Sequence, residues 1–529
     1  MTFIDPAIFI LLFAILSVPV ANRFHLPFEL FLVFGSCILS LSPWAPTFQL
    51  DPRIVFELFL PPILFYAAYF TSWREFKFNF RPISLLAVGL VTFTMTIVAI
   101  ISKIIFPDFT WAEGFLLGAI VSPTDATSAT TMIKKLGAPH RIITILEGES
   151  MVNDAAALIL YRFSLAAILS GSFSLSHVTT QFIFDTSGGV ALGLIIGVVS
   201  IYLLPKIESV TAETTFTIIT AFACYLAGEH LGVSGVITTV VCGIYCGIRV
   251  PVIATSQTRI TAKASWSTLI FIINGFVFTL IGLELPTILK NLQTDSLEIL
   301  IGYGALISLC VMLARIIWVF PMAYLPRLFS PSIARRDPMP SWKILFILSW
   351  SGMRGIVSFA AALSIPFLLS TGQAFPHRDL ILFITYCVIV FTLIIPTITL
   401  PIILHYLKIV DEKNEIRQEA IARIRSLENS ITHLKDLGSR ENISDDVLNG
   451  FLKQLDRRLN VVKTQINESP FSTLSDDHTL LKKLTLLNIE CERKTLLELR
   501  KSGEIYDEVF HQLSDELDIE ELRANSVRI

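Results

Sequence analysis

The chain has 529 residues, of which 53% are hydrophobic and only 16% are charged, and its mean hydropathy is +0.66. This composition excludes a string of ordinary soluble domains and indicates a polytopic membrane protein. The net charge of −3 gives no reason to expect a nucleic-acid partner, and the seven scattered cysteines are interpreted as apolar filler rather than a metal site or disulfide framework.

The predicted elements are membrane helices almost to residue 406. The N-terminal segment lacks a positive n-region and a small-residue cleavage site, so we expect it to remain as the first helix. Apolar segments long enough to cross about 30 Å of hydrocarbon then recur along the chain. They predict an all-α fold with about thirteen spans near residues 6–22, 27–43, 53–70, 82–106, 111–132, 142–171, 181–204, 212–230, 233–248, 265–285, 297–325, 342–371 and 379–406.

Basic residues are concentrated in one set of alternate loops. By the positive-inside rule this set is cytoplasmic, which with an odd number of spans places the N-terminus outside and the C-terminus inside. We expect the protein to lie in the plasma (inner) membrane. The other set holds little beyond Arg53, Lys290 and Arg378, whereas the basic set holds Arg23, Arg74, Lys77, Arg81, Lys134, Lys135, Arg141, Lys206, Arg249, Arg259, Lys263, Arg327, Arg335, Arg336 and Lys343.

The character of the chain changes after about residue 407. The remainder carries mixed charge, little proline and helical periodicity, which predicts a soluble helical tail. SRENISDD and NESPFSTLSDD are expected to separate its helices. We therefore predict a transmembrane domain over 1–406 and a cytoplasmic tail over 407–529, with regulation or dimerisation a better interpretation of the tail than a second enzyme.

Thirteen spans can be divided into six, one and six, as in transporters built from two inverted repeats. The fifth predicted span of each half is interrupted. Residues 111–132 contain VSPTDATSATT, where Pro123 removes a backbone donor, and residues 342–371 contain LSWSGMRGIVSF, where Gly352 and Gly355 flank Arg354. A charged residue and non-helical backbone are each costly at membrane depth unless they line a cavity. Their occurrence together therefore favours a functional cavity at these positions.

The stretch EGESMVNDAAALILYRF, residues 147–163, carries the polar groups that best fit an ion site. Ser150, Asn153 and Asp154 lie within about one and a quarter helical turns, so they project toward one region. One carboxylate and two neutral oxygens suit a hard cation such as sodium. Asp125 and the carbonyls freed near Pro123 could complete the shell.

Glu149 lies on a neighbouring part of the same predicted helix and needs a basic partner. The candidates are Arg315, Arg354 and Arg162, although Arg162 is equally suited to reach the outer interface. Glu147 is expected near the cytoplasmic end. A buried pair adds little net stability, but removing one member leaves an uncompensated charge, so a structural role for Glu149 is favoured over a transporting one.

GESMVND resembles the signature of monovalent cation:proton antiporters of the sodium/proton exchanger family. SPTDA and GMRG are similar to the two crossing broken helices of that family, and LPPILF, EHLGVSG and NGFVFTLIGLEL extend the resemblance over the membrane region. The tail looks like that of bacterial members. Each fragment is moderately specific, whereas their order and spacing together are highly specific.

The resemblance implies roles for particular residues. Asp154 would be the ion- and proton-binding carboxylate beside Asn153, and the further cation ligands would be Ser150, Asp125 and the backbone carbonyl of Thr124. Glu149 would pair with Arg315, and Arg354 would stabilise the unwound backbone of its helix. It also implies transport of Na+, K+ or Li+ against H+, no cofactor, a homodimer and a role in pH, sodium and volume homeostasis.

Competition for one site is enough for exchange. Desolvation favours the neutral form of a carboxyl group, so Asp154 can hold a proton on one side and release it for a cation on the other. Asn153 in place of a second carboxylate favours electroneutral 1:1 exchange. One departure from the family is PPILFYAAYF, which has Tyr66 and Ala67 where members often carry an acid. A cation channel, or a membrane-embedded sensor signalling through the tail, is the alternative.

Overall fold

The computed structural model describes residues 4–23, 27–42, 52–135, 138–170, 175–292, 297–369, 372–407, 412–440, 445–467, 474–502, 513–514 and 516–521. Over these ranges the regular structure is helical, apart from one isolated β-bridge between Leu368 and Ala374, so the all-α prediction is confirmed. The chain divides into two compact units, Met1–Asp411 and Glu412–Ile529, close to the boundary expected from the change in composition.

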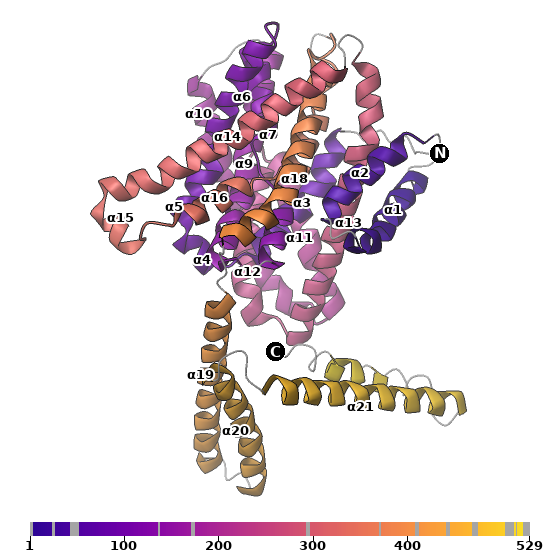
Figure 1. Ribbon diagram of the computed structural model, residues 1–529, viewed down its shortest axis with the longest axis vertical. Coiled ribbons are helices and arrows are strands. Elements are labelled where there is room, and N and C mark those ends of the chain that lie inside the picture. The colour runs from indigo at the N-terminus through magenta and orange to yellow at the C-terminus, as the bar shows by residue number, and fades with distance from the viewer. Residues whose placement is uncertain are drawn as a thin grey trace. The chain divides into compact units, whose positions relative to one another are not determined.

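Each predicted apolar segment falls on one helix or on a run of helices in the first unit (Figure 1). The first half contains α1 (Ile4–Arg23), α2 (Phe28–Ser40), α3 (Pro52–Phe70), α4 (Trp73–Phe78), α5 (Phe80–Ser84), the π-helix η1 (Leu85–Leu90), α6 (Val91–Ile105), α7 (Trp111–Val121), α8 (Ala126–Lys135) and α9 (His140–Ser170). The second half contains α10 (Leu175–Leu203), the 3₁₀ turn η2 (Leu204–Lys206), α11 (Val210–His230), α12 (Gly235–Ile253), α13 (Ser256–Asn291), α14 (Leu297–Phe329), α15 (Pro331–Arg336), α16 (Trp342–Trp350), α17 (Ile356–Leu363) and α18 (Arg378–Leu407).

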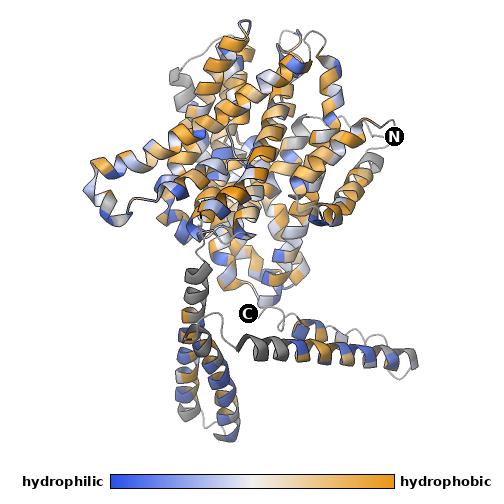
Figure 2. Cartoon of the chain, in the orientation of Figure 1, coloured by the Kyte–Doolittle hydropathy of each residue, from blue (hydrophilic) through white to orange (hydrophobic). Residues whose placement is uncertain are grey.

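Eight helical runs among the described residues are long and apolar enough to cross a membrane, or nine if a bent pair counts as one span. That pair is α1 and α2, which bend by 118°. Most of the ribbon of this unit carries the colour of hydrophobic residues in Figure 2. Shorter apolar helices cover Phe56–Phe70 and Trp111–Val121. The total of thirteen spans stays a prediction, because several of the predicted segments are short or interrupted.

Both predicted interruptions are present. Residues 122–125 separate α7 from α8, and residues 351–355 separate α16 from α17. The second interrupted segment is shorter than predicted, because α17 ends at Leu363 rather than near residue 371. Pro366 has no N–H to continue a helix, and the chain turns back so that Phe375 N–H donates to the Phe367 carbonyl at 3.0 Å.

The predicted span at 82–106 contains a π-helical turn, η1, that the sequence pattern does not indicate. The indole N–H of Trp318 on α14 donates to the Leu85 carbonyl at 3.0 Å, so it satisfies an acceptor at the start of this turn. A Cβ added at Gly89 would lie 2.5 Å from Cζ2 of Trp318. Glycine therefore permits the close packing of η1 on α14, and such turns often occur beside functional regions.

The second unit contains α19 (Glu412–Arg440), α20 (Asp445–Asn467) and α21 (Leu474–Ser502). Helices α19 and α20 lie side by side (Figure 1) and bury a small apolar cluster of Ile431, Leu452, Leu455 and Leu459. Lys463 and Glu428 form an ion pair at 2.7 Å across the two helices. The predicted breaks include residues 441–444 and 468–473, which lie outside the described ranges, and helices end and begin on either side of them.

Candidate functional site

The two interruptions meet inside the first unit. The backbone N–H of Asp125 donates to the carbonyl of Met353 at 2.8 Å, which joins the first break directly to the second. Nε of Arg354 donates to the carbonyl of Val121 at 3.3 Å, near the end of α7. The unwound backbone of each segment therefore finds hydrogen-bond partners in the other, as non-helical backbone at membrane depth requires.

Charges at the crossing match the helix ends beside them. Asp125 Oδ1 accepts from the Thr127 N–H at 2.8 Å and so caps the N-terminus of α8. A Cβ at Gly355, where α17 begins, would lie 2.3 Å from Asp125 Oδ2, so this carboxylate also approaches the start of α17 closely. The buried guanidinium of Arg354 donates to the carbonyls of Val121 and Gly352. An anion therefore lies at helix N-termini and a cation near C-terminal carbonyls, the favourable arrangement for helix dipoles.

Helix α9 brings its polar stretch against the first break. The Asn153 side-chain amide donates to Thr124 Oγ1 at 2.9 Å and to the Thr124 carbonyl at 3.4 Å. Ser150 Oγ accepts from the Ala126 N–H at 3.4 Å. The structure thus brings the five sequence-predicted ion-site residues into one region: Thr124, Asp125, Ser150, Asn153 and Asp154.

Asp154 is 7% exposed, and its carboxylate has no hydrogen-bond donor among the residues that the structure describes. Oδ1 of Asn153 is also buried and without a hydrogen-bond partner there. Buried acceptors are normally satisfied, so the unpartnered Asn153 oxygen next to the Asp154 carboxylate is unusual. Asp154 also interacts electrostatically with Asp125. Because like charges repel, a bound cation or proton would relieve this arrangement, and carboxylate and amide oxygens are suitable ligands for a hard cation.

Glu149 finds its partner in Arg315, which resolves the choice among three candidate arginines. Both guanidinium NH2 groups of Arg315 donate to the Glu149 carboxylate, with 2.7 Å between Nη2 and Oε2. Arg315 also donates to the Leu348 carbonyl from Nε and Nη2 at 3.2 and 3.1 Å. Thr124 Oγ1 donates to Glu149 Oε1 at 3.0 Å. This fully buried pair therefore connects α9, α14, α16 and the first break.

The outer charges of the 147–163 stretch point to other partners. Arg162 donates to Glu229 Oε1 at 2.6 Å and is 44% exposed, so it lies at the periphery rather than in the ion site. Glu147 pairs with Lys134 at 2.7 Å, and both side chains are exposed. The polar stretch therefore has an exposed ion pair at Glu147, a half-exposed ion pair at Arg162 and the buried Glu149–Arg315 pair, and its remaining polar residues are Ser150, Asn153 and Asp154.

Some groups around the site escaped the sequence reasoning. Thr392 Oγ1 on α18 accepts from the Arg354 N–H at 3.2 Å and so holds the second break. Ser358 on α17 has a buried hydroxyl without a partner in the described part of the chain. Both lie in apolar runs where one hydroxyl residue is an ordinary occurrence, so no sequence signal separates them from other serines and threonines.

The region around Tyr66, where the family's acidic residue is absent, is aromatic. Tyr66 is half-buried, and its ring lies 4.8 Å from that of Phe70 and 6.3 Å from that of Trp266. Its contacts are therefore with other aromatic rings on α3 and α13. No cluster of three or more histidine, cysteine or acidic side chains with metal-binding geometry occurs within the described ranges.

Comparison with known proteins agrees with this geometry. The family described as "Sodium/hydrogen exchanger, transmembrane" matches residues 8–406. The sodium, potassium, lithium and rubidium/H+ antiporter of Bacillus subtilis is 33% identical over 73% of this chain and 59% of that protein. The antiporter of the same name from Bacillus pumilus is 28% identical over 99% of this chain and 78% of that protein.

The fold also matches solved structures. The sodium proton antiporter MjNhaP1 from Methanocaldococcus jannaschii superposes with a TM-score of 0.62 at 18% identity, covering 77% of this chain and 99% of that one. The likeness supports an antiporter-type helical fold for the first unit. With the family match extending over nearly all of the membrane region, the chain belongs to the sodium/hydrogen exchanger family.

Proposed function

We propose that this protein exchanges protons for sodium, with potassium and lithium as further substrates and Asp154 as the shared site. The observation that carries the proposal is the buried Asp154 carboxylate, which has no donor among the described residues and lies beside two crossed, interrupted helices. The names of the two Bacillus relatives support a monovalent cation as substrate. Family membership also disfavours the channel and sensor alternatives.

The cation would be held by oxygen atoms from both sides of the first break. Asp154 supplies the negative charge. The neutral oxygen ligands would be Asn153 Oδ1, Ser150 Oγ and the Thr124 carbonyl. Asp125 adds a second carboxylate in electrostatic contact. The Glu149–Arg315 pair and Arg354 keep these elements in place without changing their own charge during the cycle.

Exchange follows from competition. One carboxylate cannot hold a proton and a sodium ion at the same position, so the binding of either displaces the other. Movement of one bundle against the other would then expose the occupied site to alternate sides. If Asp154 alone changes occupancy, no net charge crosses, and a membrane potential worth about 2.3 kcal/mol per charge per 100 mV does not drive the cycle.

The proposed orientation places the N-terminus outside and the tail in the cytoplasm. Loops assigned to the cytoplasm lie together: Arg141 contacts both Asn79 and Asp337, at 3.0 and 2.9 Å. Loops assigned to the outside also meet, since His377 contacts Glu113 at 3.2 Å. We further propose a homodimer in the plasma membrane that serves pH, sodium and volume homeostasis, with the tail in regulation or dimerisation.

The decisive experiment is sodium-driven proton flux in proteoliposomes, comparing wild type with Asp154→Asn. The asparagine keeps the shape but cannot titrate or neutralise a cation, so we expect flux to fall to the level of empty vesicles. Asp108→Asn, the same substitution in an exposed loop, is the matched control. Sodium-driven flux retained by Asp154→Asn in correctly folded protein would reject the assignment.

A further inference from the structure

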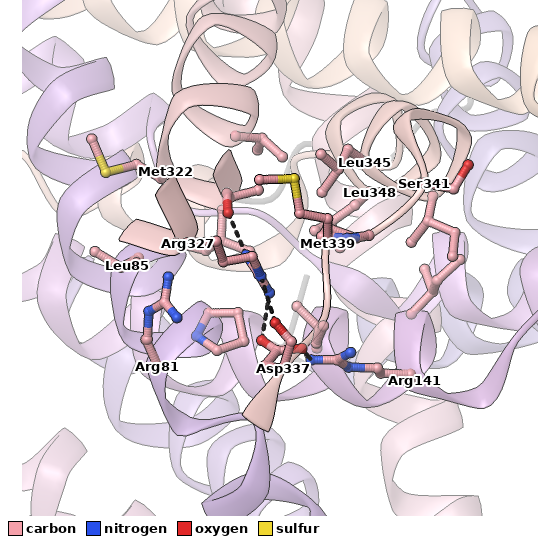
Figure 3. A pocket seen from close by; sticks show the side chains of 18 of the residues that line it. Arg81, Leu85, Arg141, Met322, Arg327, Asp337, Met339, Ser341, Leu345 and Leu348 are labelled. Carbon is pink, nitrogen blue, oxygen red and sulfur yellow. Dashed lines mark hydrogen bonds and ion pairs between the residues drawn. The ribbon is translucent and has the colours of Figure 1, made fainter. Parts of the chain in front are cut away.

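A cavity lies away from the proposed ion site, among α5, η1, α9, α14 and the segment leading into α16 (Figure 3). Its volume is about 260 Å³. Its polar lining consists of Arg81, Arg141, Arg327, Asp337 and Ser341, and its other lining residues are apolar. This cavity is not required by the exchange mechanism.

The charges in the cavity do not balance. Asp337 accepts from Arg141 at 2.9 Å and also from Arg327, which donates in addition to the Asp337 carbonyl at 3.0 Å. Arg81 makes no hydrogen bond or ion pair with any residue in the described ranges. Three guanidinium groups thus face one carboxylate, which leaves two positive charges, one of them on a half-buried side chain with unused donors.

The rest of the lining is apolar. Figure 3 shows the guanidinium groups and Asp337 gathered on one side, with Leu345 and Leu348 on another. Further apolar walls come from Leu85, Ile142 and Ile145. A ligand that fits the guanidinium side needs an anionic group that accepts several hydrogen bonds, and one that fits the apolar wall needs a hydrocarbon portion. A soluble phosphate compound has the anionic group but lacks the hydrocarbon portion.

The segments that line the cavity also expose apolar side chains at or next to the lining positions. Large apolar side chains are exposed around it, namely Phe78, Phe80, Phe329, Met339 and Trp342. Among them, Trp342 is of the type enriched at the boundary between hydrocarbon and headgroups, and the apolar phenylalanine rings suit the hydrocarbon beside it. The arginines belong to loops that we propose to be cytoplasmic, and basic pockets between membrane helices on that side suit acidic lipid headgroups.

We propose that this cavity binds an acidic phospholipid, with the phosphate on Arg81, Arg141 and Arg327 and the start of an acyl chain against the apolar wall. Pockets that enclose a whole drug-sized ligand usually measure about 300–1,000 Å³. The 260 Å³ available here therefore holds only the headgroup end, and the remaining chain lies in the bilayer. The guanidinium N–H groups of Arg81, which donate to no residue in the described ranges, would donate to the phosphate.

The site is connected to the ion-site scaffold. Leu348, which lines the cavity, accepts two hydrogen bonds from Arg315 through its carbonyl, and Arg315 in turn holds Glu149. Ile142 and Ile145 belong to α9, the helix that carries Asp154. A bound lipid would thus contact the elements that position the exchange site. Binding itself can be measured without any exchange, so it is tested separately from the proposed function.

The test is to titrate lipid into the purified, delipidated full-length protein and to measure the bound fraction by native mass spectrometry. The probes are dioleoylphosphatidylglycerol, dioleoylphosphatidylcholine and glycerol 3-phosphate. We expect the wild type to bind the acidic lipid about tenfold more tightly than the zwitterionic one, and Arg81→Gln to lose about tenfold, as one charge-assisted hydrogen bond warrants. Arg74→Gln changes an exposed arginine of α4 outside the cavity and should bind like wild type.

A second variant separates the cavity from the surrounding basic surface. Ala323→Phe fills the cavity without removing charge, so it should also weaken binding of the acidic lipid. Equal affinity for the two lipids, or wild-type binding by both Arg81→Gln and Ala323→Phe, would overturn the proposal. It would also be overturned if glycerol 3-phosphate bound as tightly as the lipid with the same dependence on Arg81, because the site would then belong to a soluble phosphate compound.

Discussion

Removing either member of the Glu149–Arg315 pair is the sharpest test of how the site is held together. Glu149 is 1% exposed and Arg315 is 0% exposed. In Glu149→Ala, the one acceptor left to the Arg315 guanidinium among the described residues is the Leu348 carbonyl. In Arg315→Met, the one donor left to the Glu149 carboxylate in the same part of the chain is the Thr124 hydroxyl. Each single variant leaves a buried charge without its counterion.

The expected loss of stability is large for each single change. A buried charge that loses its partner costs about 3–5 kcal/mol. The double variant Glu149→Leu with Arg315→Met removes both charges and leaves only neutral acceptors, such as the Leu348 carbonyl, unsatisfied at about 1–3 kcal/mol each. We therefore expect the double variant to be more stable than either single variant, a non-additivity that a surface pair does not produce.

The assay measures unfolding of detergent-purified protein. Its two readouts are tryptophan fluorescence and the yield of folded protein after heating. Glu229→Ala is the matched control, because it removes the acid from the half-exposed Arg162–Glu229 pair and should cost about 0–1 kcal/mol. Wild-type stability in both single variants would refute the reasoning. So would a double variant whose loss equals the sum of the two single losses.

The remaining predictions concern the crossing and the energetics of exchange. Gly355→Ala places a Cβ 2.3 Å from Asp125 Oδ2 and should lower sodium-driven proton flux by at least about tenfold, whereas Gly302→Ala, with no atom within 4 Å of its added Cβ, should not. Equal flux in the two glycine variants would contradict the close approach of Asp125 to α17. Wild-type exchange should be unchanged by an imposed potential in proteoliposomes, because one proton is exchanged for one monovalent cation. A steep dependence of the rate on voltage would reject electroneutrality.

The membrane region and the proposed ion-site residues could be identified from the sequence because both give local signals. Long apolar segments indicate spans wherever they occur. A carboxylate such as Asp154 inside one of them is costly enough to indicate function by itself. Breaks at Pro123 and around Gly352 are also local, and the structure places interruptions at both. The number of spans is not a local signal of this kind, because short and bent helices do not each satisfy a length criterion.

Several features could not be predicted from local pattern. The end of α17 at Leu363 was misplaced because apolar residues continue beyond it, although Pro366 and the following turn end the helix. The π-helix η1 has its first carbonyl, that of Leu85, hydrogen-bonded by Trp318, which is 233 residues away in the chain. Thr392 supports the second break from another helix and gives no signal in its own segment.

The sequence alone determined that Asp154, Asn153 and Ser150 share one helix, that two spans are broken, and that Glu149 requires a basic partner. The tertiary structure decided which partner. Three arginines satisfied the chemistry equally well, and Arg315, 166 residues away from Glu149, is the one whose guanidinium reaches it. The physical reason is that composition and periodicity belong to one segment, whereas an ion pair, a crossing of two breaks or a cavity lined by three arginines depends on which distant segments pack together.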